Sequence, residues 1–182
     1  MTAVFLDRDG VIVQKAPEGE YIANWDELRF LPDALASVSV LYKAGYKIFI
    51  VTNQRGVALR RVSLEALENM HRQMKAKFAE SGASISGIYF CPHDICENCS
   101  CRKPKPGMLL RAAEDHGLAL CCCWMVGDAA SDIEAGKSAG CKTVWIAPAG
   151  PIKGTVPRAD LVASDLRSAA RQILQVAPLA LY

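Results

Sequence analysis

The chain contains four short apolar runs, and each of them ends abruptly in polar or metal-binding residues. The runs span 3–6, 46–51, 85–90 and 122–126, and they lead into Asp7, Thr52, Cys91 and Gly127-Asp128. Runs of this length suit buried strands, and helical spacing of apolar residues lies between successive runs. Strands that alternate with helices favour a parallel sheet covered on both faces. The sequence therefore predicts an α/β fold, a three-layer doubly wound parallel sheet.

The segments between the apolar runs carry ordinary helix signals. We expect helices over 33–45, 63–80, 107–116, 131–139 and 165–176, with Asp33 as the N-cap of the first. We also expect a fifth strand over 143–147 and a short edge strand over 159–163. Residues 11–32 contain Pro17, Gly19 and Pro32 among residues of mixed polarity, which predicts an irregular flap over the site. The 182 residues then form a single domain, 1–182, without a large cap.

The polar residues that follow the strands are expected to meet at one edge of the sheet. Ligands bind at the carboxyl ends of strands in such folds. Asp7 and Asp9 would share a face, about 7 Å apart along the strand. Two carboxylates so placed are tolerated if a divalent cation lies between them, or if one attacks while the other moves a proton. A polar strand end that faces water remains an equal alternative on these residues alone.

Two further groups of side chains suit a phosphate and its metal ion. The carboxylates are Asp7, Asp9 and Asp128, with Asp132 behind them. The complementary donors are Thr52, Asn53, Arg102 and Lys103. Magnesium prefers hard oxygen ligands, while ammonium, hydroxyl and guanidinium groups bind phosphoryl and other anionic oxygens. The set predicts a magnesium-assisted phosphate site.

The eight cysteines fall mainly into two clusters. In the first, Cys91, His93, Cys99 and Cys101 offer three thiolates and one imidazole, the set that zinc takes in closed structural sites. Zinc would fold the loop of about 91–107 that presents Arg102 and Lys103. Cys96 lies within this loop and remains open as a ligand in place of Cys99. The second cluster, Cys121, Cys122 and Cys123, lies in an apolar run and is expected to be buried.

Composition limits the class of protein further. The net charge of +2 gives no support for a nucleic-acid partner, and no apolar run approaches the length of a membrane span. Without a signal peptide, a cytoplasmic location is expected. We expect a monomer that acts on a small molecule. His71 and His116 are expected at the surface or near a helix end.

Several of these motifs resemble those of a known family. Asp7-x-Asp9-Gly10, Val51-Thr52-Asn53, Lys103, and Gly127-Asp128 with Asp132 are similar to the four ordered motifs of the haloacid dehalogenase (HAD) superfamily of phosphohydrolases. A branch of that superfamily contains histidinol phosphatase and D-glycero-D-manno-heptose 1,7-bisphosphate 7-phosphatase. The matching segments are Thr52-Asn53-Gln54, Cys91-Pro92-His93, Cys99-x-Cys101-Arg102-Lys103-Pro104 and Pro106-Gly107-Met108. The resemblance covers the whole chain and implies a HAD-like, Rossmannoid fold.

The resemblance also implies roles for individual residues. Asp7 would be the nucleophile and Asp9 the acid and base, while Thr52 and Lys103 grip the phosphoryl oxygens. Magnesium would be held by Asp7, the main-chain carbonyl of Asp9, and Asp128. Substrate contacts would come from Tyr21, Asn53, Gln54, Arg55 and Arg102. The family's lysine after Gly-Asp is replaced here by Ala129, and Arg55, Arg60 and Arg61 are candidates to compensate for it.

The function that this resemblance implies is magnesium-dependent removal of the C7 phosphate of D-glycero-D-manno-heptose 1,7-bisphosphate through an aspartyl phosphate. Such a reaction supplies heptose precursors for lipopolysaccharide or related glycans. Histidinol phosphatase is the closest alternative. A nucleic-acid 3'-phosphatase is disfavoured by the modest charge. A non-enzymatic phosphoacceptor domain is disfavoured by Asp9, because an acid and base beside the nucleophile promotes turnover.

Overall fold

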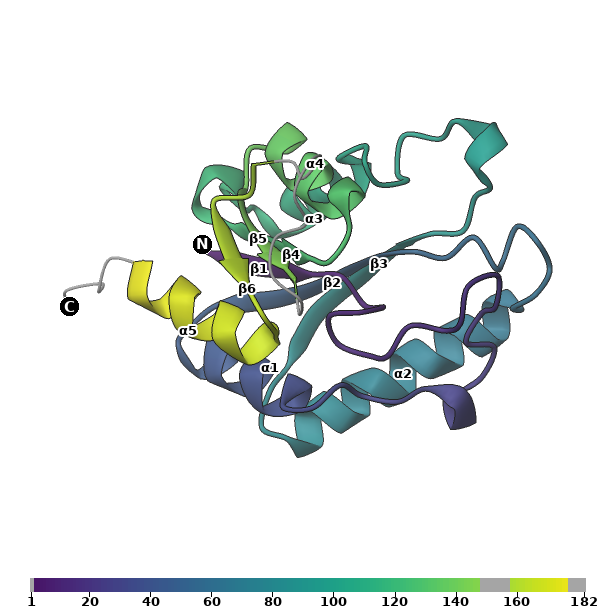
Figure 1. Ribbon diagram of the computed structural model, residues 1–182, viewed down its shortest axis with the longest axis horizontal. Helices are drawn as coiled ribbons and strands as arrows, with labels where there is room; N and C mark the ends of the chain where they lie inside the picture. Colours follow the sequence, from purple (N-terminus) through teal and green to yellow (C-terminus); the bar gives the residue numbers. More distant parts are fainter. Residues whose placement is uncertain (1, 148–157, 177–182) are drawn as a thin grey trace.

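Six parallel strands form one sheet at the centre of the molecule (Figure 1). The structure is a computed structural model that describes residues 2–147 and 158–176. The sheet order is β3-β2-β1-β4-β5-β6. The strands are β1 (Ala3–Leu6), β2 (Lys47–Asn53), β3 (Ile85–Cys91), β4 (Trp124–Gly127), β5 (Lys142–Ile146) and β6 (Leu161–Ala163). The predicted doubly wound sheet is confirmed, with the short strand β6 at its edge.

Helices cover both faces of this sheet (Figure 1). On one face lie α1 (Ala34–Lys43), α2 (Leu64–Glu80) and α5 (Leu166–Val176), and on the other lie α3 (Gly107–His116) and α4 (Ala130–Ser138). Three short 3-10 helices are η1 (Trp25–Glu27), η2 (Ile95–Glu97) and η3 (Leu120–Cys122). No helix among residues 2–147 and 158–176 is long and apolar enough to cross a membrane.

The alternation of side chains along β1 divides the core into two parts. Val4 and Leu6 pack with the α1, α2 and α5 side, whereas Ala3 and Phe5 pack with the α3 and α4 side. All four side chains are fully buried, as a central strand covered on both faces requires. β1 pairs with β2 on one side and β4 on the other, so the chain order reverses beside it. The crevice at this reversal is where ligands bind in such sheets.

Two local expectations were wrong. Asp33 precedes α1 as predicted, but its φ of 59° places it in the left-handed region and its side chain makes no capping bond. Its carboxylate pairs instead with Arg167 of α5. The second cysteine cluster is buried only at Cys123, because Cys121 and Cys122 lie exposed in η3 before β4 begins.

His71 was also predicted wrongly, since it is buried in the core. It lies on the inner face of α2, one turn after Leu67, and only 7% of it is exposed. Its ring centroid lies 5.5 Å from that of Phe90, and its Nε2 atom has no hydrogen-bond partner. Burial lowers the pKa of His71 to about 3, and Arg8 adds to this shift. The prediction relied on the polar neighbours of His71 in the sequence. Burial depends instead on which face of the helix a residue occupies, and His71 lies on the buried face of α2.

A substitution of His71 will change the acid sensitivity of the fold. The unfolded chain binds a proton near pH 6.5 and the folded chain does not until about pH 3, so stability falls as the pH drops below 6.5. Between pH 7 and pH 5 this costs about 2 kcal/mol. In urea unfolding, the free energy of unfolding of His71→Leu should fall by about 2 kcal/mol less between pH 7 and pH 5 than that of the wild type. An equal loss in both proteins would contradict a neutral, buried His71.

Candidate active site

A cavity of about 300 Å³ lies at the carboxyl ends of the central strands. Part of its lining comes from the strand ends and from Lys103, and another part comes from the flap of residues 11–32. The lining residues with polar side chains are Asp7, Arg8, Asp9, Lys15, Glu20, Tyr21, Thr52, Asn53, Gln54, Lys103, Asp128, Ser131 and Asp132. Residues from three of the four strand ends that were expected to converge, Asp7, Thr52 and Asp128, line the cavity, whereas Cys91 at the end of β3 does not. The flap does approach the site.

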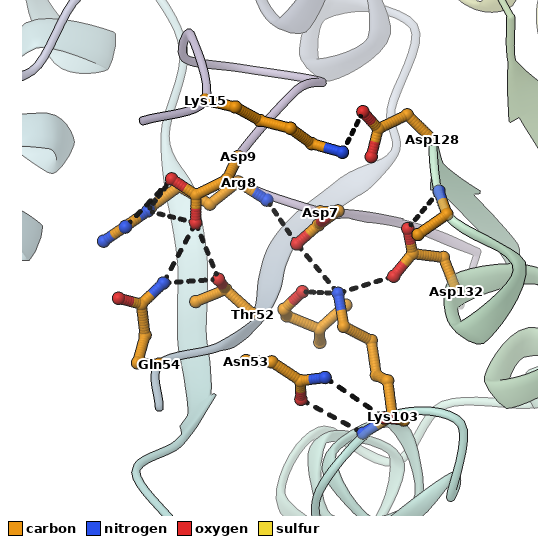
Figure 2. Close-up of polar contacts among 12 residues, drawn as sticks. Asp7, Arg8, Asp9, Lys15, Thr52, Asn53, Gln54, Lys103, Asp128 and Asp132 are labelled. Carbon is orange, nitrogen blue, oxygen red and sulfur yellow. Dashed lines mark hydrogen bonds and ion pairs between the residues drawn. The ribbon is translucent and has the colours of Figure 1, made fainter. Parts of the chain in front are cut away.

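Asp7 lies at the floor of this cavity, directly after β1 (Figure 2). Its backbone N–H donates to the Val126 carbonyl, which fixes the turn against β4. Its Oδ1 atom accepts from the Arg8 backbone N–H and from Lys103 Nζ, both at 2.8 Å. Burial raises the pKa of Asp7 to about 7, although the Lys103 ammonium opposes this shift. Additional positive charge is needed to keep this carboxylate ionised at neutral pH.

Lys103 is almost fully buried, and three oxygens surround its ammonium group. Nζ lies 2.8 Å from Asp7 Oδ1, 2.7 Å from Asp132 Oδ1 and 2.9 Å from the Val51 carbonyl. Burial alone would lower the pKa of Lys103, but the two carboxylates outweigh it and raise the pKa. Asn53 holds the main chain of Lys103 through two hydrogen bonds of 3.1 Å. Asn53 thus fixes the position of this buried ammonium.

The Asp9 carboxylate is held by a separate group of donors (Figure 2). Arg8 donates to both carboxylate oxygens through Nε and Nη2 at 3.0 to 3.2 Å. Gln54 Nε2 donates to Asp9 Oδ2 at 3.0 Å and to Thr52 Oγ1 at 2.8 Å. The Thr52 hydroxyl lies 3.4 Å from the same Oδ2 atom. Asp9 is therefore oriented by three neighbours and stays partly exposed to the cavity.

Three carboxylates form a site that fits a divalent cation. Oxygens of Asp7, Asp128 and Asp132 all lie within 4.8 Å of one another. Asp128 Oδ1 is buried without a hydrogen-bond partner, which is costly unless a cation binds there. Gly10 has a φ of 93°, and a Cβ atom on it would lie 2.0 Å from Asp128 Oδ2, so only glycine fits there. Oxygen ligands and a negative excess are what magnesium requires.

The side chains in this cluster differ in one respect from the expected magnesium ligands. Asp132, expected behind the site, belongs to the group of three, and its Oδ2 accepts from the Ala129 N–H at 3.0 Å. The Asp9 side chain does not belong to it. This arrangement is compatible with a role for Asp9 through its main-chain carbonyl, which was the expected mode of binding.

A second group of metal-binding side chains lies in the loop after β3. Atoms of Cys91, His93, Cys99 and Cys101 lie within 4.8 Å of one another, while Cys96 is exposed and outside the group. The Sγ atom of Cys99 lies 3.5 Å from those of Cys91 and Cys101. Tetrahedral zinc with bonds of about 2.3 Å sets its sulfurs roughly 3.8 Å apart. The geometry suits zinc, and it favours Cys99 over Cys96 as a ligand.

The predicted substrate contacts divide into two groups. Tyr21, Asn53 and Gln54 line the cavity. Arg55 lies outside its lining and pairs with Asp94. Arg102 also lies outside the lining, where its Nη1 donates to the His93 carbonyl at 3.4 Å.

Lys15 of the flap was missed by the sequence reasoning. Its Nζ lies 2.7 Å from Asp128 Oδ2. The only signal was a cation inside the segment that we expected to cover the site.

The fold and this set of residues define a hydrolase of the HAD type. Residues 100–169 match the family model described as HAD-hydrolase-like. The chain belongs to the family of the D-glycero-beta-D-manno-heptose-1,7-bisphosphate 7-phosphatases, and like its relatives it is a phosphatase.

Relatives of that name cover nearly the whole chain. The enzyme of Pseudomonas aeruginosa is 35% identical over 94% of this chain and 97% of its own length. That of Bordetella bronchiseptica is 32% identical over 97% of this chain and 100% of its own.

A solved structure supports the same family. D,D-heptose 1,7-bisphosphate phosphatase from B. bronchiseptica, crystallised with magnesium and phosphate, superposes with a TM-score of 0.89 and 31% identity. The superposition covers 97% of this chain and 100% of that one. The corresponding enzyme from Burkholderia thailandensis gives a TM-score of 0.70 at 27% identity, with coverage of 96% and 99%.

Proposed function

We propose that this phosphatase removes the C7 phosphate of D-glycero-β-D-manno-heptose 1,7-bisphosphate and so supplies heptose precursors for lipopolysaccharide or related glycans. The observation that carries the proposal is Asp7, buried beside Lys103 at the floor of a cavity that also contains Asp9. The names of the relatives support the substrate and its β anomer. We further propose a monomeric, cytoplasmic protein whose 182 residues form one domain.

Asp7 acts as the nucleophile in this proposal. Its Oδ1 atom accepts two hydrogen bonds, which leaves Oδ2 to attack the phosphorus in line with the departing sugar oxygen. The Asp7 Oδ2–phosphorus bond forms while the bond to the C7 oxygen breaks, giving an aspartyl phosphate. Water then attacks the same phosphorus and releases inorganic phosphate. Lys103, beside Asp7, and Thr52 place positive charge and a hydroxyl near the phosphoryl oxygens.

Asp9 moves the protons. It gives one to the leaving C7 oxygen in the first step and takes one from the attacking water in the second. Gln54 and Arg8 hold its carboxylate in one orientation, so they are positioning residues. The two carboxylates thus have different roles, as their different partners suggest.

Two metal sites accompany this chemistry in the proposal. Magnesium, held by Asp7, Asp128 and the main-chain carbonyl of Asp9, offsets negative charge on the phosphoryl group. The carboxylate cluster of this chain supports it. Zinc, held by Cys91, His93, Cys99 and Cys101, has a structural role.

Substrate selection falls to the cavity wall. Tyr21 and Asn53 face the space where the sugar lies, and the cavity of about 300 Å³ suits a phosphate with part of a sugar. Arg55 and Arg102 lie farther out and are proposed to contact the distal part of a bisphosphate. Arg55 is held there by Asp94.

A substrate comparison tests the function. With magnesium present, kcat/KM for the heptose 1,7-bisphosphate should exceed that for histidinol phosphate by about 100-fold or more, because only the bisphosphate can use the outer cationic contacts. Release of inorganic phosphate measures both rates. Comparable values for the two compounds would contradict the proposed substrate, and no rate with any sugar phosphate would contradict the proposed function.

A further inference from the structure

Lys15 links the flap to the proposed magnesium site. Its Nζ atom lies 2.7 Å from Asp128 Oδ2 and makes no other ion pair or hydrogen bond among the residues that the structure describes (Figure 2). Just over half of its side chain is exposed, whereas Asp128 is largely buried. The contact is therefore made by a long, movable side chain to a fixed carboxylate.

The other two cations that line the cavity are already committed. Lys103 Nζ donates hydrogen bonds to Asp7 and to the Val51 carbonyl, and it forms an ion pair with Asp132. Arg8 is bound to both oxygens of Asp9. Arg8 Nη1 has no hydrogen-bond partner in the described structure, but it is buried. Of the three lining cations, Lys15 is the one whose side chain is exposed, at 52%, against 2% for both Arg8 and Lys103. An incoming anion therefore meets Lys15 as the most available donor.

Asp128 cannot serve Lys15 and a divalent cation equally well. An ammonium ion and a metal ion compete for the same carboxylate, because two cations bound to one carboxylate repel each other. The space is narrow as well, because a Cβ on Gly10 would lie 2.0 Å from Asp128 Oδ2 and 2.6 Å from Lys15 Cε. Binding of a metal ion at Asp128 therefore frees the end of Lys15.

We infer that Lys15 is a mobile cation of the active site. It holds Asp128 in the metal-free protein and moves to a phosphate oxygen of the substrate once Asp128 binds magnesium. This inference rests on the proposed function for its metal site and its phosphomonoester. Ala129, next to Asp128, offers no charge, and Arg55 is paired with Asp94, so Lys15 supplies the cation on this side of the cavity.

Two titrations of Lys15→Met test the inference. The variant should bind Mg²⁺ at least about threefold more tightly than the wild type in phosphate-free calorimetry, because it lacks a competitor for Asp128. At saturating Mg²⁺, phosphorus NMR should show inorganic phosphate binding weakened about tenfold, the loss of one charge-assisted hydrogen bond. Lys15→Arg should keep phosphate affinity within about threefold of the wild type, because a guanidinium restores the donor.

Lys137→Met is the matched control. Lys137 is exposed on α4 and lies outside the cavity lining, so the same loss of charge should leave both affinities unchanged. Unchanged Mg²⁺ affinity or unchanged phosphate affinity in Lys15→Met would overturn the inference. Neither titration uses a sugar. If the wild type binds Mg²⁺ and phosphate but does not hydrolyse the heptose bisphosphate, only the proposed substrate is refuted.

Discussion

Replacing Asp7 by asparagine will lower kcat by about 10⁴-fold or more, the largest effect that we expect from any single substitution in this chain. An amide oxygen is a poor nucleophile and cannot form the aspartyl phosphate. The side chain is otherwise matched in shape, and Asp7→Asn removes a buried carboxylate whose pKa is raised to about 7. The folded protein should therefore be no less stable than the wild type in thermal unfolding without metal.

The companion substitution Asp9→Asn separates the two roles. It removes the acid and base but leaves the nucleophile, so kcat should fall by about 10² to 10⁴-fold. Acid quenching during turnover should trap phosphoenzyme in the wild type and in Asp9→Asn, and none in Asp7→Asn. Phosphoenzyme in Asp7→Asn, or equal rates in the wild type and Asp9→Asn, would contradict the proposed mechanism.

The convergence of Asp7, Thr52 and Asp128 was predictable because it follows from topology. Each residue comes directly after an apolar run, and parallel strands end at the same edge of a sheet. β1 lies between β2 and β4 in the sheet, so the ends of these three strands are neighbours. The main chain therefore brings these positions together, whatever the side chains do.

The destinations of long side chains were not predictable in the same way. Arg55 reaches Asp94, and Lys15 reaches Asp128, in both cases a partner on a distant segment. No local pattern encodes such a choice, because it depends on which carboxylate the fold brings within reach. His71 shows the same limit for burial, since a polar sequence context did not reveal its inward position on α2.

Substitution of Cys99 by serine will disrupt the loop between β3 and α3. Loss of a group that only hydrogen-bonds to a metal ligand weakens metal binding by up to roughly 100-fold. Loss of one of the four ligands themselves should weaken zinc binding by more than that. The loop leads directly to Lys103. Asn53 accepts a hydrogen bond from the main chain of Lys103, and Lys103 Nζ donates to Asp7. We expect the melting temperature to fall by about 10 °C or more, and kcat/KM to fall with it.

Cys96→Ser separates this effect from a general loss of thiols. Cys96 lies in the same loop but is exposed and outside the group formed by Cys91, His93, Cys99 and Cys101. Its substitution should leave zinc content, melting temperature and rate unchanged. Metal analysis that finds zinc lost from Cys96→Ser and kept by Cys99→Ser would contradict the ligand set, and a wild type with far less than about one zinc per chain would contradict the site.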